Sequence, residues 1–209
     1  MQNINFNYLE GVKSDFKFKG NRNYLHGTDF VDFIFPKILE NKINDLGFIK
    51  FKFKNKCNKN IFISSRNFNQ NKFAEIILKD KHSNLKYNLN AYEILDNYIS
   101  KNYNFNEKNI YQQSIINKLN LSSKFKINKK FSIIENIVSN TKFLHLKVYG
   151  LKSKWYFVEI KYIFSGLNKI KKSNVFKINI ISNTANKITQ TKLTQDEIQI
   201  ALINFFRYE

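Results

Sequence analysis

Proline, glycine and cysteine are scarce in this chain. Of its 209 residues, one is proline, six are glycine and one is cysteine. Hydrophobic residues make up 43% of the sequence and aromatic residues 16%, which is ample for a packed core and excludes a mainly disordered chain. The length suits one large domain or two small ones.

Acidic residues are also few, 16 against 35 basic ones, and the formal net charge is +19. A field of that size attracts polyanions such as nucleic acid, anionic lipid or an acidic protein. Arginine, which makes bidentate contacts to phosphate and guanine, occurs only as Arg22, Arg66 and Arg207. Diffuse electrostatic attraction to polyanions is therefore better supported than recognition of specific nucleic-acid bases. The abundance of Lys, Asn, Ile, Phe and Tyr is also what an AT-rich genome encodes.

The single cysteine, Cys57, cannot form an internal disulfide, which favours a reducing compartment. It lies in an expected hairpin turn. The nearby Lys56 and Lys59 could lower the pKa of its thiol, which is the argument for a reactive role. Charges interrupt the first twenty positions, and no run approaches the ~20 apolar residues of a membrane span. We expect no signal peptide, no membrane span, and a cytoplasmic location or the interior of an organelle that encodes the protein.

Hydrophobic periodicity predicts helices and strands along both halves of the chain. A helix is expected over residues 28–45, capped by Thr28 or Asp29, with Pro36 marking a kink or a second helix. A second helix is expected over 130–146. Alternating segments predict strands at 15–19, 48–54, 61–63, 73–79, 85–89, 154–164, 175–182 and 187–193. The segments 91–100 and 107–119 are interpreted as helical or mixed.

Residues Thr194 to Glu197 form a capping-box pattern that predicts a C-terminal helix. The halves match in pattern at an offset of 103 residues, which places Gly27–Phe35 on Lys130–Val138 and Phe73–Asp80 on Phe176–Asn183. We predict an α+β fold with two tandem helix-plus-antiparallel-sheet repeats, 1–105 and 106–209, the second ending in the C-terminal helix.

A helix of about five turns followed by a curled antiparallel sheet resembles the hotdog fold. Two tandem copies resemble the double-hotdog proteins, in which one chain forms a pseudo-dimeric unit. Ser132–Val138 is similar to the central-helix stretch of 3-hydroxyacyl-carrier-protein dehydratases, where an acidic residue follows an aliphatic run. Under the offset, Asp32 corresponds to Glu135. The chain lacks the Pro- and Gly-rich loop with histidine that precedes this helix in those enzymes, and only His26 offers an imidazole near a helix start.

The resemblance implies binding or turnover of an acyl thioester, linked to CoA or to an acidic acyl carrier protein, in fatty-acid or polyketide-type metabolism. Dehydration needs a base for the α-proton and an acid for the leaving hydroxyl, and thioester hydrolysis is the other activity implied. The candidate catalytic residues are His26, Asp32 and Glu135, with His26 of one half facing Glu135 of the other, and a helix-start amide polarising the carbonyl. No cofactor or metal site is expected, and self-association stays open.

Other interpretations remain open for the same residues. His26 would then cap or line a helix start, and Asp32 and Glu135 would be solvated helix positions. His145 is expected in the core or at its edge, and His82 in an exposed turn. A rival function is RNA binding or a ribosomal role, with residues 50–59 and 169–172 neutralising phosphates. A third is a non-catalytic hotdog-like binding protein.

Overall fold

The computed structural model describes residues 7–40, 46–83, 85–150, 153–167 and 175–208. The chain divides into two compact units, Met1–Phe105 and Asn106–Glu209, called unit 1 and unit 2 below. Each consists of one long helix and an antiparallel sheet, so the predicted α+β class with tandem helix-plus-sheet repeats is confirmed. Among the described residues, no helix is long and apolar enough to cross a membrane.

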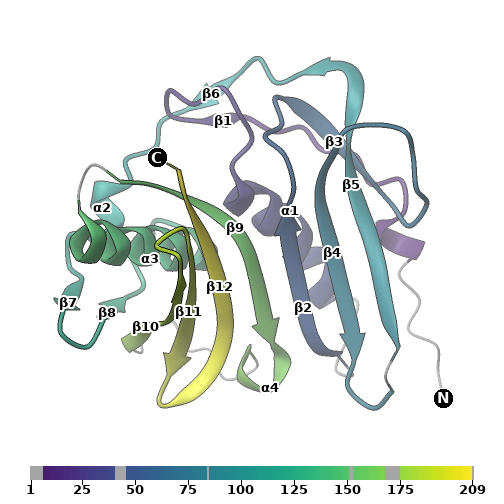
Figure 1. Ribbon diagram of the computed structural model, residues 1–209. Helices are drawn as coiled ribbons and strands as arrows, with labels where there is room; N and C mark the ends of the chain where they lie inside the picture. The colour runs from purple at the N-terminus through teal and green to yellow at the C-terminus, as the bar shows by residue number, and fades with distance from the viewer. Residues whose placement is uncertain (1–6, 41–45, 84, 151–152, 168–174, 209) are drawn as a thin grey trace. The chain divides into compact units, whose positions relative to one another are not determined.

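Unit 1 is built on helix α1 (Gly27–Glu40) and four strands (Figure 1). The strands are β2 (Leu46–Phe53), β3 (Lys59–Ser64), β4 (Lys72–Asp80) and β5 (Lys86–Tyr98), in the sheet order β3-β5-β4-β2. Short elements precede and follow them: η1 (Asn7–Leu9), β1 (Phe18–Lys19) and β6 (Asn102–Tyr103). Strand β1 pairs with β6 in parallel, which brings Lys19 beside Tyr103.

Aromatic packing joins α1 to its sheet. The ring of Phe30 on α1 meets Phe51 and Phe73 edge to face, at centroid distances of 6.1 and 5.4 Å. Such pairs add about 0.5–1.5 kcal/mol beyond the area they bury. Helix α1 runs through Pro36 as one element, so no second helix begins there. Residues 41–45 of the predicted helix lie outside the described residues.

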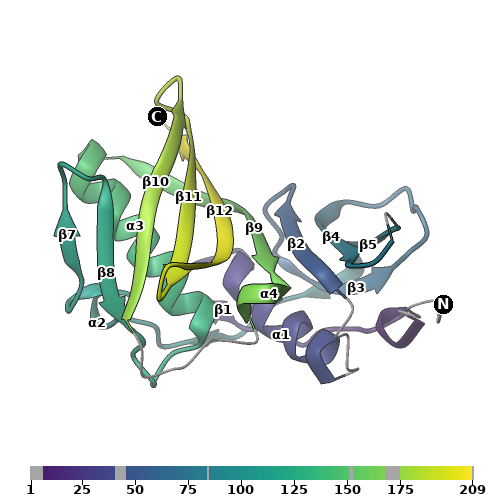
Figure 2. The ribbon, with the colours of Figure 1, turned by 90° about the horizontal axis from the view of Figure 1, so that it is seen from below.

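Unit 2 is built on helix α3 (Ile133–Tyr149), which begins at the capping box of Ser132 and Glu135 and ends before Gly150. The other elements are α2 (Lys108–Tyr111), β7 (Ile115–Asn117), β8 (Ser122–Lys126), β9 (Lys154–Ile163), α4 (Phe164–Leu167), β10 (Val175–Thr184), β11 (Ile188–Gln195) and β12 (Ile198–Tyr208). The sheet order is β9-β12-β11-β10-β8-β7. Figures 1 and 2 both show α3 lying against the curled strands of this unit.

The predicted C-terminal helix is wrong, because residues 198–208 form strand β12. Asp196 and Glu197 adopt positive φ angles of 49° and 63° and make the tight turn between β11 and β12, not a helix cap. The side chains then alternate in burial, and β12 pairs on both sides, with β11 and β9. Pairing on two edges overrides the local helix signal.

The helical or mixed interpretation of residues 91–100 is also wrong, since most of this segment belongs to the long strand β5. Strand β5 lies between β3 and β4 and pairs with both. Its buried stretch, Leu89 to Tyr92, has no strict alternation that the sequence could have revealed. Segment 107–119 is mixed as expected, with the short helix α2 followed by β7.

The two units differ in strand order. After α1, the strands lie in the order first, third, fourth, second (β2-β4-β5-β3), whereas after α3 they lie first, fourth, third, second (β9-β12-β11-β10). The 103-residue offset therefore superposes β4, a third strand, on β10, a second strand. It overlaps the central helices, whose first residues, Gly27 and Ile133, are 106 apart, but it does not relate the strands.

Candidate functional site

A connected polar network lies at the start of α1. Lys19 is 1% exposed. Its Nζ donates to the hydroxyl of Thr28 at 2.5 Å and pairs with Oδ1 of Asp29 at 2.7 Å. The hydroxyl of Tyr103 donates to the same carboxylate oxygen at 2.9 Å. Burying a charge lowers the stability of the fold unless the charge is paired. Here the buried ammonium of Lys19 is paired with the carboxylate of Asp29.

His26 joins the network through Thr28. Its Nδ1 lies 2.9 Å from the Thr28 hydroxyl and 3.4 Å from the Thr28 backbone nitrogen, which donates to it. Because the Lys19 ammonium can only donate, it uses a lone pair of the Thr28 oxygen and leaves that hydroxyl's hydrogen for His26. Both contacts make Nδ1 an acceptor, so the neutral imidazole carries its proton on Nε2. In this tautomer the N–H group of the His26 ring is at Nε2.

Asp32 lies one turn further along α1, three residues after Asp29 and four after Thr28. Residues at these spacings share a helix face. The structure therefore brings two of the three predicted catalytic residues, His26 and Asp32, to the same end of α1, where both are half-buried.

Glu135 is held at the start of α3. Its Oε2 accepts from the backbone N–H of Ser132 at 2.9 Å, and the Ser132 hydroxyl accepts from the N–H of Glu135 at 3.1 Å. Counted from the first helical residue, Glu135 occupies the third position of α3, as Asp29 does in α1. The structural counterpart of Glu135 is therefore Asp29, at an offset of 106, and not Asp32.

Three participants of the α1 network, Lys19, Asp29 and Tyr103, were not among the predicted catalytic residues. Asp29 had a usable signal, because an acidic residue in the first turn interacts favourably with the helix N-terminus. Lys19 and Tyr103 had none, since they meet through the β1–β6 pairing of segments more than 80 residues apart in the chain.

His145 is completely buried in unit 2. Its Nδ1 lies 2.7 Å from the carbonyl of Thr141, and its Nε2 lies 2.5 Å from the hydroxyl of Thr189. A carbonyl only accepts, so Nδ1 carries the proton and Nε2 accepts from Thr189. Burial lowers the pKa of His145 to about 4. The residue is a neutral core histidine, as its place on the helix predicted.

Cys57 is 1% exposed, and burial raises its thiol pKa to about 12. The effect of burial outweighs that of the nearby lysine charge, so the thiol is protonated at neutral pH and unsuited to nucleophilic chemistry. His82 is exposed in the turn after β4, where its backbone N–H donates to Asp80 at 2.8 Å.

Several lysines of the 50–59 stretch are engaged within unit 1. Lys54 pairs with Glu75 at 3.1 Å, and the ammonium groups of Lys56 and Lys59 lie over the rings of Tyr24 and Tyr98. The other stretch suggested for RNA, residues 169–172, lies outside the described residues.

No family model and no curated protein matches this sequence. Solved structures do match. The tesB protein of Mycobacterium avium subsp. paratuberculosis has a TM-score of 0.50 at 5% identity, over 92% of this chain and 91% of that one. An acyl-ACP thioesterase of Bacteroides thetaiotaomicron matches with a TM-score of 0.46 at 6% identity, over 94% of this chain and 97% of that one. A PpsC dehydratase domain of Mycobacterium tuberculosis matches with a TM-score of 0.44 at 5% identity, over 88% of this chain and 84% of that one. The chain has the hotdog fold, as its resemblance to that superfamily predicted.

Proposed function

We propose that this chain binds or turns over an acyl thioester, carried by CoA or by an acyl carrier protein, at the start of α1. The observation that carries the proposal is the buried network in which Lys19, Thr28 and Asp29 hold His26 in one tautomer. Hydrogen-bonded clusters that orient an imidazole are typical of acid–base sites. The hotdog fold, shared with the tesB protein, supports the same class of substrate.

His26 supplies the proton or hydrogen bond from Nε2. In dehydration, a carboxylate takes the α-proton, the bond between the β-carbon and its hydroxyl breaks, and the Nε2 proton of His26 passes to the departing hydroxyl so that water leaves. No imidazolate forms, because Nδ1 takes the hydroxyl proton of Thr28 in the same step and the Lys19 ammonium replaces it. In hydrolysis, water attacks the thioester carbonyl, the carbon–sulfur bond breaks, and the proton removed from water passes to the departing thiolate. The backbone N–H groups of Thr28, Asp29 and Phe30 already donate to His26, so these three amides of the first turn are not available to a developing oxyanion.

Asp32 and Glu135 are the two carboxylates proposed as bases. Asp32 lies on the helix that begins directly after His26, whereas Glu135 already accepts a capping hydrogen bond from Ser132. Asp32 is therefore favoured as the base that works with His26. For Glu135, variants must separate a contribution to catalysis from its role in capping α3.

The net charge of +19 supports a carrier-linked substrate, because acyl carrier proteins are acidic and an attractive field accelerates encounter. This predicts turnover of a carrier-linked substrate that falls more steeply with salt than turnover of a short neutral thioester.

The test is turnover of 3-hydroxyacyl-CoA and acyl-CoA, with thiol release reporting hydrolysis and enoyl formation reporting dehydration. His26→Gln and Asp32→Asn are expected to lower the rate by about 10²–10⁴-fold. His82→Gln and Asp15→Asn, which change exposed positions, are the matched controls. Absence of both turnover and saturable thioester binding would overturn the proposal. Recovery of RNA with the protein, removable only by nuclease or salt, would favour the nucleic-acid alternative instead.

A further inference from the structure

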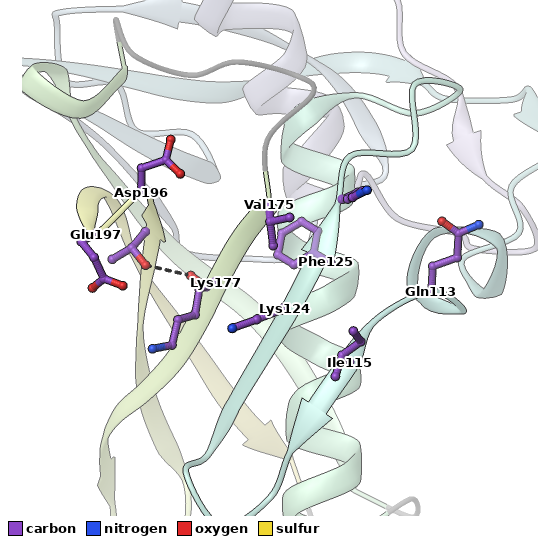
Figure 3. A pocket seen from close by; sticks show the side chains of 10 residues that line it. Gln113, Ile115, Lys124, Phe125, Val175, Lys177, Asp196 and Glu197 are labelled. Carbon is purple, nitrogen blue, oxygen red and sulfur yellow. Dashed lines mark hydrogen bonds between the residues drawn. The ribbon is translucent and has the colours of Figure 1, made fainter.

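Unit 2 contains a cavity of about 470 Å³ that shares no residue with the candidate site at the start of α1 (Figure 3). This size falls in the range of small-molecule sites, roughly 300–1,000 Å³. Strands β7, β8 and β10 and the turn between β11 and β12 contribute its lining, which combines apolar, basic and acidic side chains. The residues that matter for its chemistry are Ile115, Lys124, Val175, Lys177, Thr194 and Glu197.

The register of the sheet explains how these side chains come together. Lys177 on β10 stands directly opposite Lys124 on β8 and Thr194 on β11. Ile115 on β7 stands opposite Lys124 from the other side. Directly opposed residues in antiparallel strands project from the same face, so these four form one row across the sheet. Figure 3 shows Lys124 extending toward Lys177.

Ile115, Lys124 and Lys177 of this row face away from the core, whereas Thr194 at its end is buried. Phe125 and Phe176, which neighbour Lys124 and Lys177 in sequence, are 3% and 0% exposed, and side chains alternate between faces along a strand. Apolar surface nevertheless remains open beside the lysines, because Ile115 is 72% exposed and Val175 44% exposed. Positive charge and accessible aliphatic surface thus adjoin in one cavity.

Lys124 and Lys177 are unfavourably placed, because their positive charges are directly opposite each other in the sheet. Like charges directly opposite in a sheet are destabilising, and among the residues that the structure describes it gives no ion pair to either Lys124 or Lys177. An anion between the two ammonium groups would relieve this repulsion. The carboxylates of Asp196 and Glu197, at the turn between β11 and β12, also line the cavity and limit how much negative charge it accepts, which favours a single anionic head over a polyanion.

We propose that this cavity binds an amphipathic monoanion, with its carboxylate or phosphate-type head between Lys124 and Lys177 and its aliphatic part on Ile115 and Val175. The hydroxyl of Thr194, at the end of the row, lies within the lining and donates to the backbone carbonyl of Lys177 at 3.5 Å, so the head relies on the two lysines. This site does not depend on thioester turnover at α1, since it shares no residue with the proposed catalytic group.

The experiment is isothermal titration of the full chain with octanoate, with octanol as the uncharged analogue and with inorganic phosphate as the head alone. Octanoate is expected to bind saturably and more tightly than either comparison ligand. The double variant Lys124→Gln/Lys177→Gln is expected to weaken octanoate about tenfold, as the loss of two charge contacts implies. Val175→Ser tests the apolar part and is expected to weaken octanoate while leaving the response to phosphate unchanged.

The matched control is Lys79→Gln/Lys86→Gln. These lysines are also direct cross-strand partners, lie in unit 1, line no part of this cavity, and change the net charge by the same amount. This control should bind octanoate as the unmodified chain does. Equal weakening by both double variants would show general electrostatics and overturn the site. Absence of saturable octanoate binding, or equal affinity for octanol or for phosphate, would overturn it as well.

Discussion

The ammonium of Lys19 lies 2.7 Å from the Asp29 carboxylate, and the lysine side chain is wholly inaccessible while that of Asp29 is 12% exposed. The pair connects the segment before α1 to the first turn of the helix. The Tyr103 hydroxyl and the Phe105 ring, 4.9 Å from Nζ, complete its surroundings. The start of α1 is thus held from two distant parts of the chain.

Replacing Lys19 by Met should destabilise the protein strongly. The change leaves the Asp29 carboxylate without its ammonium partner, and breaking a buried pair from one side costs about 3–5 kcal/mol. The double change Lys19→Met/Asp29→Asn should recover part of that loss, because no charge is then left behind. Urea unfolding measures both, with Lys17→Met, an exposed lysine two residues away, as the control. A cost below about 1 kcal/mol, or strictly additive effects, would contradict the role assigned to the pair.

Cys57 should resist thiol reagents in the native protein. Its sulfur is buried, contacts the carbonyl of Lys59 at 3.1 Å, and has a pKa raised to about 12, so almost no thiolate forms at pH 8. Since it is the only cysteine, the thiol released in a disulfide-exchange assay reports this residue alone. Labelling should be slow in buffer and rapid in urea. Rapid labelling of the folded protein would show that the β2–β3 turn opens readily.

The stability of the protein should fall in a specific pH window because of His145. Burial lowers its pKa from 6.5 to about 4, so the folded state favours the neutral ring and the unfolded state binds more protons between those values. The contribution is complete above pH 6.5 and is lost as the pH falls through the window toward 4. A shift of this size corresponds to roughly 3 kcal/mol.

Denaturation at several pH values, on the unmodified chain and on His145→Gln, isolates this contribution. The variant should be less stable at neutral pH, because it disturbs the contacts to Thr141 and Thr189, but its stability should fall less steeply between pH 6.5 and 4. His82→Gln, at an exposed site, should retain the steeper dependence. Parallel curves for His145→Gln and the unmodified chain would show that His145 is not the titrating group.

The sequence was sufficient to predict elements with a strong single periodicity. Strand β2 alternates lysine and aromatic residues, and α3 combines a capping box with apolar residues spaced three and four apart. Strand β5 was misjudged because four consecutive residues, Leu89 to Tyr92, are buried, so no alternation marks this stretch as a strand. For β12, the turn at Asp196 and Glu197 has the same residue types as a helix cap, and only the positive φ angles distinguish the two.

Only the residues of the candidate site that lie close together in the sequence could be predicted. His26 and Asp32 stand within two turns of a helix whose start is visible in the sequence. Lys19 and Tyr103 reach that start through the pairing of β1 with β6, two-residue strands that no periodicity can reveal. Lysine-rich composition also concealed Lys19, because one buried lysine looks no different from the many that are exposed.

Glu135 offers a way to separate helix capping from catalysis. Glutamine also serves at this position of a capping box, so Glu135→Gln should change the free energy of unfolding by less than about 0.5 kcal/mol. Ser132→Ala removes the hydroxyl that accepts from the Glu135 N–H at 3.1 Å and should cost about 1 kcal/mol. If Glu135 acts only as a cap, Glu135→Gln will leave thioester turnover and stability nearly unchanged. If it is a base, turnover will fall by about 10²-fold or more while the unfolding curve stays in place. Ser132→Ala supplies the control for turnover lost merely through a weakened helix start, since it disturbs the cap and leaves the carboxylate present.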